Sequence, residues 1–249
     1  MVDAKYVKVK GYKKKIAFIY GIDFLTHDIP VCLLGKSENY QICHDFFVIL
    51  KNSNYPLRGI VTDELESIFM ACKHVWGDKI LRQLCHTHFA EKIRRKLKVR
   101  TEKQYVEFMR ELERIIFFKQ SKKRFRKKKK MKKELYELAL KCAGDMVKLD
   151  VLVDISNNFD DLTNYLKIGQ CPKTNNLIES YNSQLEGRLK TIKGFESFKL
   201  AKQWLNAWIL CRRNTKFFDC AGDFKCLNGK TSLEVTKKTG TILPNFFPK

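Results

Sequence analysis

The first hundred residues alternate short apolar segments with amphipathic ones, and this order restricts the chain to few folds. Strand patterns at 4–10, 15–26 and 29–36 are separated by the turn signals "KGYKKK" and "THDIP", which predicts an antiparallel meander. Two further strands alternate with three helical patterns, at 38–52 (helix), 57–63 (strand), 64–76 (helix), 79–85 (strand) and 88–98 (helix). Because helical crossovers join parallel strands, the sequence predicts an α/β fold with a mixed five-stranded sheet.

The rest of the chain is predicted to be mostly helical. Helical patterns fill residues 100–168, with a third helix of this region over about 154–168, and they resume at 174–190 and 196–213. An irregular tail follows. The dense cationic run at 119–133 is either a solvated segment or a phosphate-binding arm. We favour the arm, because such a run repels itself unless a counter-anion is bound.

The charge balance predicts a polyanionic partner. Lys and Arg number 49 against 27 Asp and Glu, for a formal net charge of +22. Nucleic acid fits this charge best, and an anionic membrane surface is the alternative. No apolar run reaches spanning length, and no signal-peptide pattern opens the sequence, so we expect no membrane partner. The nine cysteines follow no disulfide framework, which favours reduced thiols in a cytosolic or nuclear setting.

Three acids lie at the ends of predicted elements. Asp3 opens the first strand, Asp63 closes the fourth, and Glu179 lies in the first turn of a late helix. Two-metal phosphoryl transfer uses carboxylates from separate rigid elements, and Mg²⁺ prefers such oxygen ligands. Each acid also has a structural interpretation. Asp3 can be a polar residue near a terminus, Asp63 can cap the next helix, and Asn176 with Glu179 has the spacing of a capping box.

Two motifs carry a resemblance to a known family. The segment "QLCHTHFAEKIRRKL" contains a C-x-x-H pattern at Cys85 and His88, and "TNNLIESYNSQLEGRLKTIKGFESFKLAKQWLNAW" contains Glu179. With the order of elements, they resemble the ribonuclease H-like catalytic domain of DDE transposases of the Mutator-like and insertion-sequence type. The tail "LNGKTSLEV" is also similar. The resemblance covers nearly the whole chain. It implies a ribonuclease H-like core at 1–98, a helical insertion at 99–169, core completion at 170–215 and a C-terminal tail at 216–249.

The resemblance also implies a chemistry. Asp3, Asp63 and Glu179 would bind two Mg²⁺ or Mn²⁺ ions, and the enzyme would nick DNA and transfer the strand to target DNA. Cys85 and His88 would order the site or contact DNA. Such transposases act on transposon ends as homo-oligomers, and a nucleoid-associated place in a prokaryotic cytoplasm fits the family and the thiols.

Other interpretations of the C-x-x-H pattern remain open. Cys85, His86 and His88 could contribute to a zinc site, but no second ligand pair lies at suitable spacing. A Cys85–His88 nucleophilic pair lacks an evident orienting group. Packing at a strand-to-helix junction is the simplest interpretation.

Several basic residues are candidate phosphate contacts, which would position DNA without reading its sequence. They follow the C-x-x-H motif, form the central run, follow Glu179 or end the next helix: Arg94, Arg95, Lys96, Lys127, Lys128, Lys129, Lys130, Arg188, Lys190, Lys193, Arg212 and Arg213. Trp204 and Trp208 are four residues apart on a predicted helix, a spacing that favours core packing over base stacking.

Two further functions compete with the strand transferase. Transposases of this type usually carry an N-terminal DNA-binding region, whereas this sequence begins two residues before Asp3. The main alternative is therefore a truncated, catalytically inactive transposase derivative that binds nucleic acid. A ribonuclease H-type or resolvase-type nuclease would share the same three acids.

Overall fold

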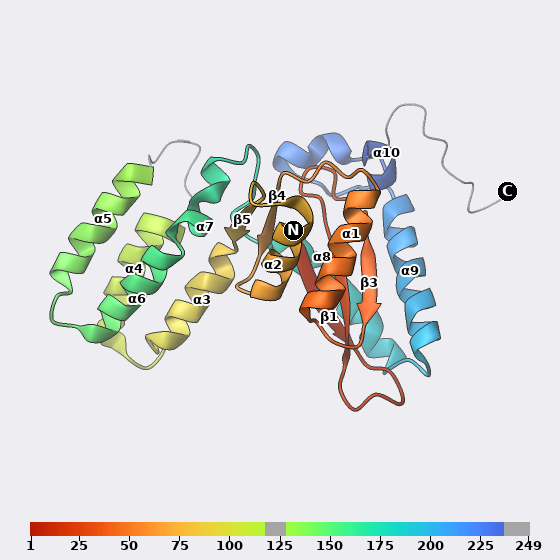
Figure 1. The fold of residues 1–249 in the computed structure, drawn as a ribbon, viewed down its shortest axis with the longest axis horizontal. Coiled ribbons are helices and arrows are strands. Elements are labelled where there is room, and N and C mark those ends of the chain that lie inside the picture. Colours follow the sequence, from red (N-terminus) through yellow and green to blue (C-terminus); the bar gives the residue numbers. More distant parts are fainter. Residues whose placement is uncertain (118–127, 237–249) are drawn as a thin grey trace. The chain divides into compact units, whose positions relative to one another are not determined.

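The computed structural model describes residues 1–117 and 128–236, which fold as two compact units (Figure 1). Residues 1–55 and 177–236 form the first, here called the terminal unit. The described residues between 56 and 176 form the second, the central unit. No helix of the described residues is long and apolar enough to cross a membrane.

A three-stranded antiparallel sheet is the base of the terminal unit. It contains β1 (Val2–Val7), β2 (Ile16–Gly21) and β3 (Cys32–Gly35), with β2 in the middle. All six residues of β2 are buried, as expected of a strand covered on both faces. The register places Asp3 opposite Tyr20.

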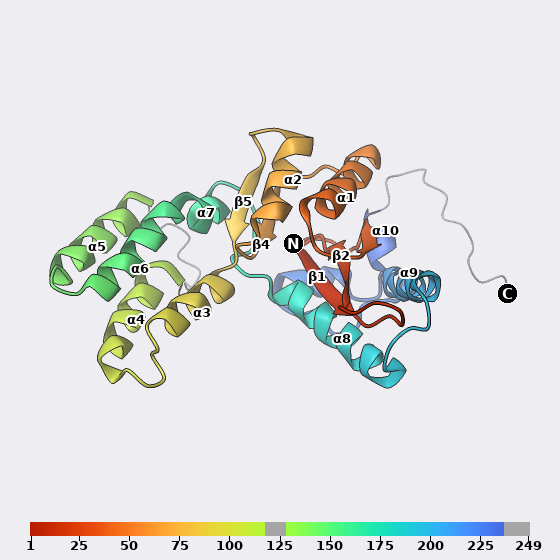
Figure 2. The same ribbon diagram turned by 60° about the horizontal axis from the view of Figure 1, so that its bottom comes forward.

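Helices cover both faces of this sheet. Helix α1 (Tyr40–Asn52) lies on one face, and α8 (Asn176–Ile192) and α9 (Phe198–Asn214) lie on the other (Figure 2). The approach of α1 is close, because a Cβ added to Gly21 would lie 3.1 Å from the Phe46 ring. The opposite core joins β1 and β2 to both later helices through Val7, Phe18, Tyr20, Ile178, Leu185, Leu205 and Ile209. Two short elements, η4 (Gly222–Leu227) and α10 (Ser232–Thr236), complete the unit.

The central unit begins with two parallel strands and continues as helices. Strands β4 (Gly59–Thr62) and β5 (Leu81–Leu84) pair in parallel, and α2 (Glu66–Trp76) is the connection between them. The helical elements that follow are α3 (His86–Lys96), η1 (Lys103–Tyr105), α4 (Val106–Leu112), η2 (Glu113–Phe117), α5 (Lys128–Lys141), α6 (Met146–Asn157), α7 (Phe159–Thr163) and η3 (Asn164–Leu166). Their core includes Ile93, Leu112, Met131, Val151, Ile155 and Leu162.

The α/β class, the antiparallel meander and the parallel pair joined by a helix are confirmed. The structure describes a three-stranded and a two-stranded sheet, so their union into one five-stranded ribonuclease H-like sheet stays a prediction. The four functional segments with boundaries at residues 98, 169 and 215 also stay predictions.

The predicted helix over about 154–168 has wrong bounds, although most of its residues are helical. Helix α6 already begins at Met146, because Asp145 Oδ1 accepts hydrogen bonds from the N–H groups of Val147 and Lys148. The helix ends at Asn157, and the short α7 and η3 follow. The apolar spacing continues across this break, so periodicity alone joins the two helices that the turn at Asn158 separates.

Candidate active site and nucleic-acid surface

In the terminal unit, Asp3 is tied to the helix that carries Glu179. Asp3 Oδ2 accepts a hydrogen bond from Asn182 Nδ2 at 2.7 Å, and Asp3 Oδ1 accepts one from the Ala4 N–H at 2.8 Å. Tyr20 donates its hydroxyl hydrogen to Asn182 Oδ1, also at 2.7 Å. A carboxylate only accepts hydrogen bonds, so the bond to Asp3 fixes the Asn182 amide orientation. Strands β1 and β2 and helix α8 thus meet in one polar network.

Tyr20 is a fixed donor in this network. Its side chain is fully buried, and its ring lies edge-on to Trp208 with the centroids 6.4 Å apart. Burial and, next, the charge of Asp3 raise the pKa of Tyr20 far above its usual value. The phenol therefore stays protonated and keeps Asn182 in place.

Glu179 lies three residues before Asn182 on α8 and is half-buried. Positions i and i+3 share one side of a helix, so Glu179 projects from the side of α8 that meets Asp3 through Asn182. Asn176 is the first residue of α8 and not the residue before it, so the capping-box interpretation loses its geometry. Ser183 Oγ donates to the Glu179 backbone carbonyl at 3.0 Å.

Asp63 belongs to the central unit and follows β4 directly. Its Oδ1 accepts a hydrogen bond from the Leu65 N–H at 3.1 Å, so it closes the turn before α2. The interpretation of Asp63 as the cap of α2 is wrong, because the N-cap position is Leu65 and no side chain caps the helix there. The half-buried Asp63 makes no ion pair with any described residue. Its carboxylate could still bind a metal, because only one oxygen is used by the turn.

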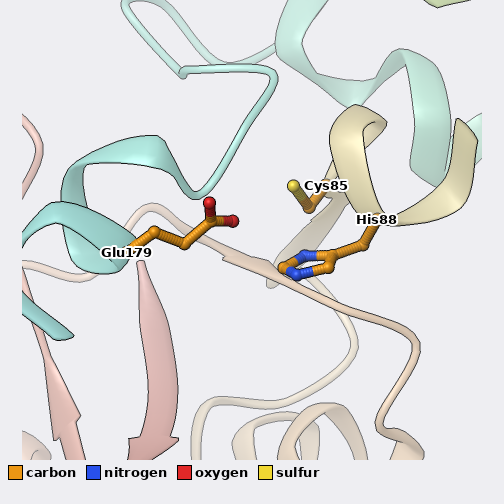
Figure 3. Close-up of side chains that lie close together, drawn as sticks. All are labelled: Cys85, His88 and Glu179. Carbon is orange, nitrogen blue, oxygen red and sulfur yellow. The ribbon is translucent and has the colours of Figure 1, made fainter. Parts of the chain in front are cut away.

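Cys85 and His88 lie together at the start of α3, and Glu179 projects from the first turn of α8 (Figure 3). Cys85 is buried and precedes the first residue of α3, whereas His88 is exposed. Burial raises the pKa of the Cys85 thiol, but hydrogen bonds from the His88 side chain and from the backbone of His88 and Asn175 outweigh it. The net pKa is below its usual value. The helix start therefore favours a thiolate here.

This pair does not form a structural zinc site within the central unit. The Cys85 and His88 ligand atoms lie within 4.8 Å of each other, and no other His, Cys or carboxylate of the described central unit joins them. Two ligands are two short of the usual four. The backbone of Asn175 donates to Cys85 Sγ at 3.3 Å, and the Cys85 N–H donates to the Thr62 carbonyl at 2.8 Å. Cys85 thus joins β4 through its backbone and the segment before α8 through its thiol.

His86 has a structural role beside this pair. It is 2% exposed, and its Nε2 is 2.7 Å from the Leu162 carbonyl, to which the neutral ring donates. Burial lowers the pKa of His86 to about 4, while the bond to Leu162 partly opposes this effect. The ring is therefore neutral at ordinary pH.

We expect His86 to make folding sensitive to acid. Protonation of the unfolded chain begins near pH 6.5, whereas the folded ring resists it down to about pH 4, so stability falls across this window as pH is lowered. The loss approaches about 3 kcal/mol at its acid end. Urea unfolding followed by fluorescence of Trp76, the tryptophan of the central unit, measures it. His86→Gln should remove this dependence, and the exposed-site control His74→Gln should keep it. An unchanged pH profile in His86→Gln would contradict the assignment.

The structure separates the predicted DNA-contact residues into paired and unpaired groups. Those of α3 and α5 are mostly engaged by acids of the same unit, through Arg94–Glu113, Arg95–Glu91, Lys96–Asp150, Lys128–Asp160 and Lys130–Glu134. Lys129 is exposed, and Lys127 lies outside the described residues. Surface ion pairs are weak, about 0–1 kcal/mol, so they do not exclude phosphate binding.

In the terminal unit, most candidates make no ion pair with a described residue. Arg188, Lys190 and Lys193 are exposed, and the Arg212 guanidinium lies 4.7 Å from the centre of the Tyr181 ring. Arg213 differs, because it forms a two-pronged ion pair with the buried Asp28 at 2.7 and 2.9 Å. The structure therefore gives Arg213 a structural role, while its predicted DNA contact is untested.

Sequence reasoning missed two residues of the Asp3 network, Asn182 and Tyr20. The signal was present for Asn182, which follows Glu179 by three residues and therefore lies on its side of the helix. Tyr20 gave no such signal, because its pairing with Asp3 depends on the strand register.

Two comparisons of the sequence with known proteins found no match. No model of a protein family matches the sequence, and no curated protein matches it. The functional assignment therefore depends on the motifs and on the geometry just described.

Proposed function

We propose that the protein is a metal-dependent DNA-cleaving and strand-transferring enzyme of the ribonuclease H-like DDE type. The observation that carries the proposal is the hydrogen bond from Asn182 to Asp3, which joins the first strand to the helix of Glu179. Two of the three proposed ligands thus come from rigid elements that one network connects. The resemblance of the "TNNLIES" and C-x-x-H segments supports the same assignment.

The chemistry of the donor set fits Mg²⁺ or Mn²⁺. Asp3, Asp63 and Glu179 would supply carboxylate oxygens, the ligands that hard cations prefer. Two bound ions would supply charge stabilisation for the attacking and leaving oxygens of a phosphodiester. In this proposal Asp63 completes the ligand set from the end of β4, with β4 and β5 extending the sheet of β1, β2 and β3 to the five-stranded arrangement.

Other residues of the protein would position the metal ligands and bind the DNA backbone. Asn182 and Tyr20 hold Asp3. In the proposal the phosphates of the DNA backbone are neutralised by Arg188, Lys190, Lys193 and Arg212. Cys85 and His88 order the segment before α8 through the bond to Asn175. We further propose that a homo-oligomer assembles on DNA, as in the family that the motifs resemble, in a prokaryotic cytoplasm.

A nicking assay tests the proposal. Supercoiled plasmid is incubated with the full chain and Mg²⁺ or Mn²⁺, and wild type is compared with Glu179→Gln, which keeps the size of the side chain and removes its charge. We expect nicking by wild type and a loss of about 10³-fold or more in the variant, about 4 kcal/mol of transition-state stabilisation. Equal nicking by both proteins would remove Glu179 from the reaction.

A non-catalytic DNA-binding protein is the second candidate. The unpaired Arg188, Lys190 and Lys193 favour it, because phosphate binding needs no intact metal site. Salt-sensitive DNA binding without nicking in either metal would establish this function in place of the first. Joined donor-target products, as opposed to nicks alone, separate strand transfer from simple nuclease activity.

A further inference from the structure

A basic pocket in the terminal unit is not used by the proposed reaction. It has a volume of about 440 Å³ and lies between α8 and α9. Its lining consists of Gln184, Arg188, Trp208, Cys211, Arg212 and Thr215. The volume falls within the roughly 300–1,000 Å³ of typical small-ligand sites, and the lining contains two arginines and no acid.

Both arginines keep their charge available. Neither forms an ion pair with a described residue, in contrast to Arg213, which is held by Asp28. Arg188 is exposed and Arg212 is half-buried, fixed against the face of Tyr181. A planar guanidinium held in this way loses little side-chain entropy when it binds a phosphate. The pocket therefore has one cation at its edge and one fixed inside.

Trp208 gives the pocket an aromatic wall. The structure confirms the predicted core packing, since Trp204 and Trp208 both pack against the sheet. Trp208 also lines the pocket, so part of its indole faces the core and part faces the pocket. Its edge-on contact with Tyr20 holds the indole in place. An aromatic wall next to guanidinium groups is the combination that binds unpaired nucleotides, through base stacking and phosphate contacts.

We infer that this pocket binds an unpaired nucleotide of a DNA strand, with the base stacked on Trp208 and phosphate contacts from Arg188 and Arg212. The inference rests on the proposed function in taking DNA as the partner. The pocket is separate from the proposed metal site. Glu179 and Arg188 are nine positions apart, which is two and a half turns of α8, so they lie on opposite sides of the helix. The pocket would hold the strand away from the reacting phosphate.

Binding is measured without metal, in EDTA, so that a failure of catalysis does not affect the result. The probe is a fluorescent oligothymidylate of about a dozen nucleotides, within the roughly 4–16 nucleotides of single-strand sites. We expect Arg188→Gln to weaken binding about tenfold and to make the salt dependence shallower by about 0.7. The matched control, Lys202→Gln, removes one exposed charge from α9 outside the pocket and should bind as wild type.

Variants at Trp208 separate stacking from folding. Trp208→Leu should weaken binding about 5- to 100-fold, and Trp208→Phe should restore most of it, because a phenyl ring still stacks. Both variants are first compared with wild type by thermal unfolding. If Arg188→Gln and Trp208→Leu both bind as wild type, as Lys202→Gln does, the inference is wrong even where wild type nicks plasmid.

Cys211 provides a direct local readout. This exposed thiol lines the pocket, whereas Cys226 is exposed elsewhere in the terminal unit and is the internal reference. The oligonucleotide should slow alkylation of Cys211 by iodoacetamide and leave Cys226 unchanged, as measured by mass spectrometry of the two peptides. Equal alkylation of Cys211 with and without saturating oligonucleotide would overturn the assignment. Full protection by thymidine monophosphate alone would overturn the strand as the ligand.

Discussion

Asp28→Asn should destabilise the terminal unit by about 3–5 kcal/mol, the usual cost of leaving one member of a buried ion pair without its partner. Asp28 is 1% exposed, and its two oxygens accept hydrogen bonds from Arg213, from Ser232 Oγ at 3.1 Å and from Thr236 Oγ1 at 3.0 Å. The loop after β2, the end of α9 and α10 thus meet at one carboxylate. Removal of its charge leaves Arg213 uncompensated.

Urea unfolding in a Trp76→Phe background measures this loss, because the remaining tryptophans, Trp204 and Trp208, both belong to the terminal unit. The double variant Asp28→Asn/Arg213→Gln should recover part of the stability, since it leaves no unpaired charge. The exposed pair of Lys10 with Glu196 is the control, and Glu196→Gln should unfold as wild type. An Asp28→Asn variant as stable as wild type would show that the ion pair does not hold these elements together.

Asp3→Asn should reduce metal-dependent nicking by about 10³-fold or more, because a proposed metal ligand loses its charge. Asn182→Ala should reduce it by about 10- to 100-fold, the usual effect of removing a residue that positions a ligand. Asn182 acts through Asp3, so its loss should also raise the Mg²⁺ concentration needed for half-maximal nicking. Plasmid nicking over a Mg²⁺ titration measures both effects.

Ser183→Ala is the matched control on the same helix. Its hydroxyl donates to the Glu179 backbone carbonyl and not to Asp3 or Asn182, and nicking should be unchanged. Tyr20→Phe should shift the Mg²⁺ requirement in the same direction as Asn182→Ala but by less, because the amide loses one of its two fixed bonds. If Asn182→Ala behaves as Ser183→Ala, then Asn182 does not position Asp3 for catalysis.

The strands and most helices could be predicted from the sequence because their signals are local. The fully apolar "IAFIYG" segment forms β2, and the helical spacing of residues 38–52 ends with α1 at Asn52. The break between α6 and α7 was missed, because a turn at Asn158 determines it more than periodicity does. A single five-stranded sheet would need contacts between residues far apart in sequence, which no local pattern encodes.

The candidate site was predictable only in part for the same reason. Asp3, Asp63 and Glu179 were identified by their places at element ends and by the motifs around them. The Asn182–Asp3 bond joins residues 179 positions apart, and strand register places Tyr20 beside it. The ion pair between Arg213 and Asp28 could not be predicted either, because a count of basic residues does not show which of them pair with acids.

The division of the cations into paired and unpaired groups changes what a salt titration of DNA binding would report. Each phosphate neutralised releases counterions, so the slope of log affinity against log salt counts contacts and not formal charge. The formal charge of +22 sets only an upper bound, because many lysines and arginines of the central unit already have carboxylate neighbours. If the protein binds DNA as proposed, the salt dependence would therefore be shallower than the formal charge suggests, and the contacts would be weighted toward α8 and α9.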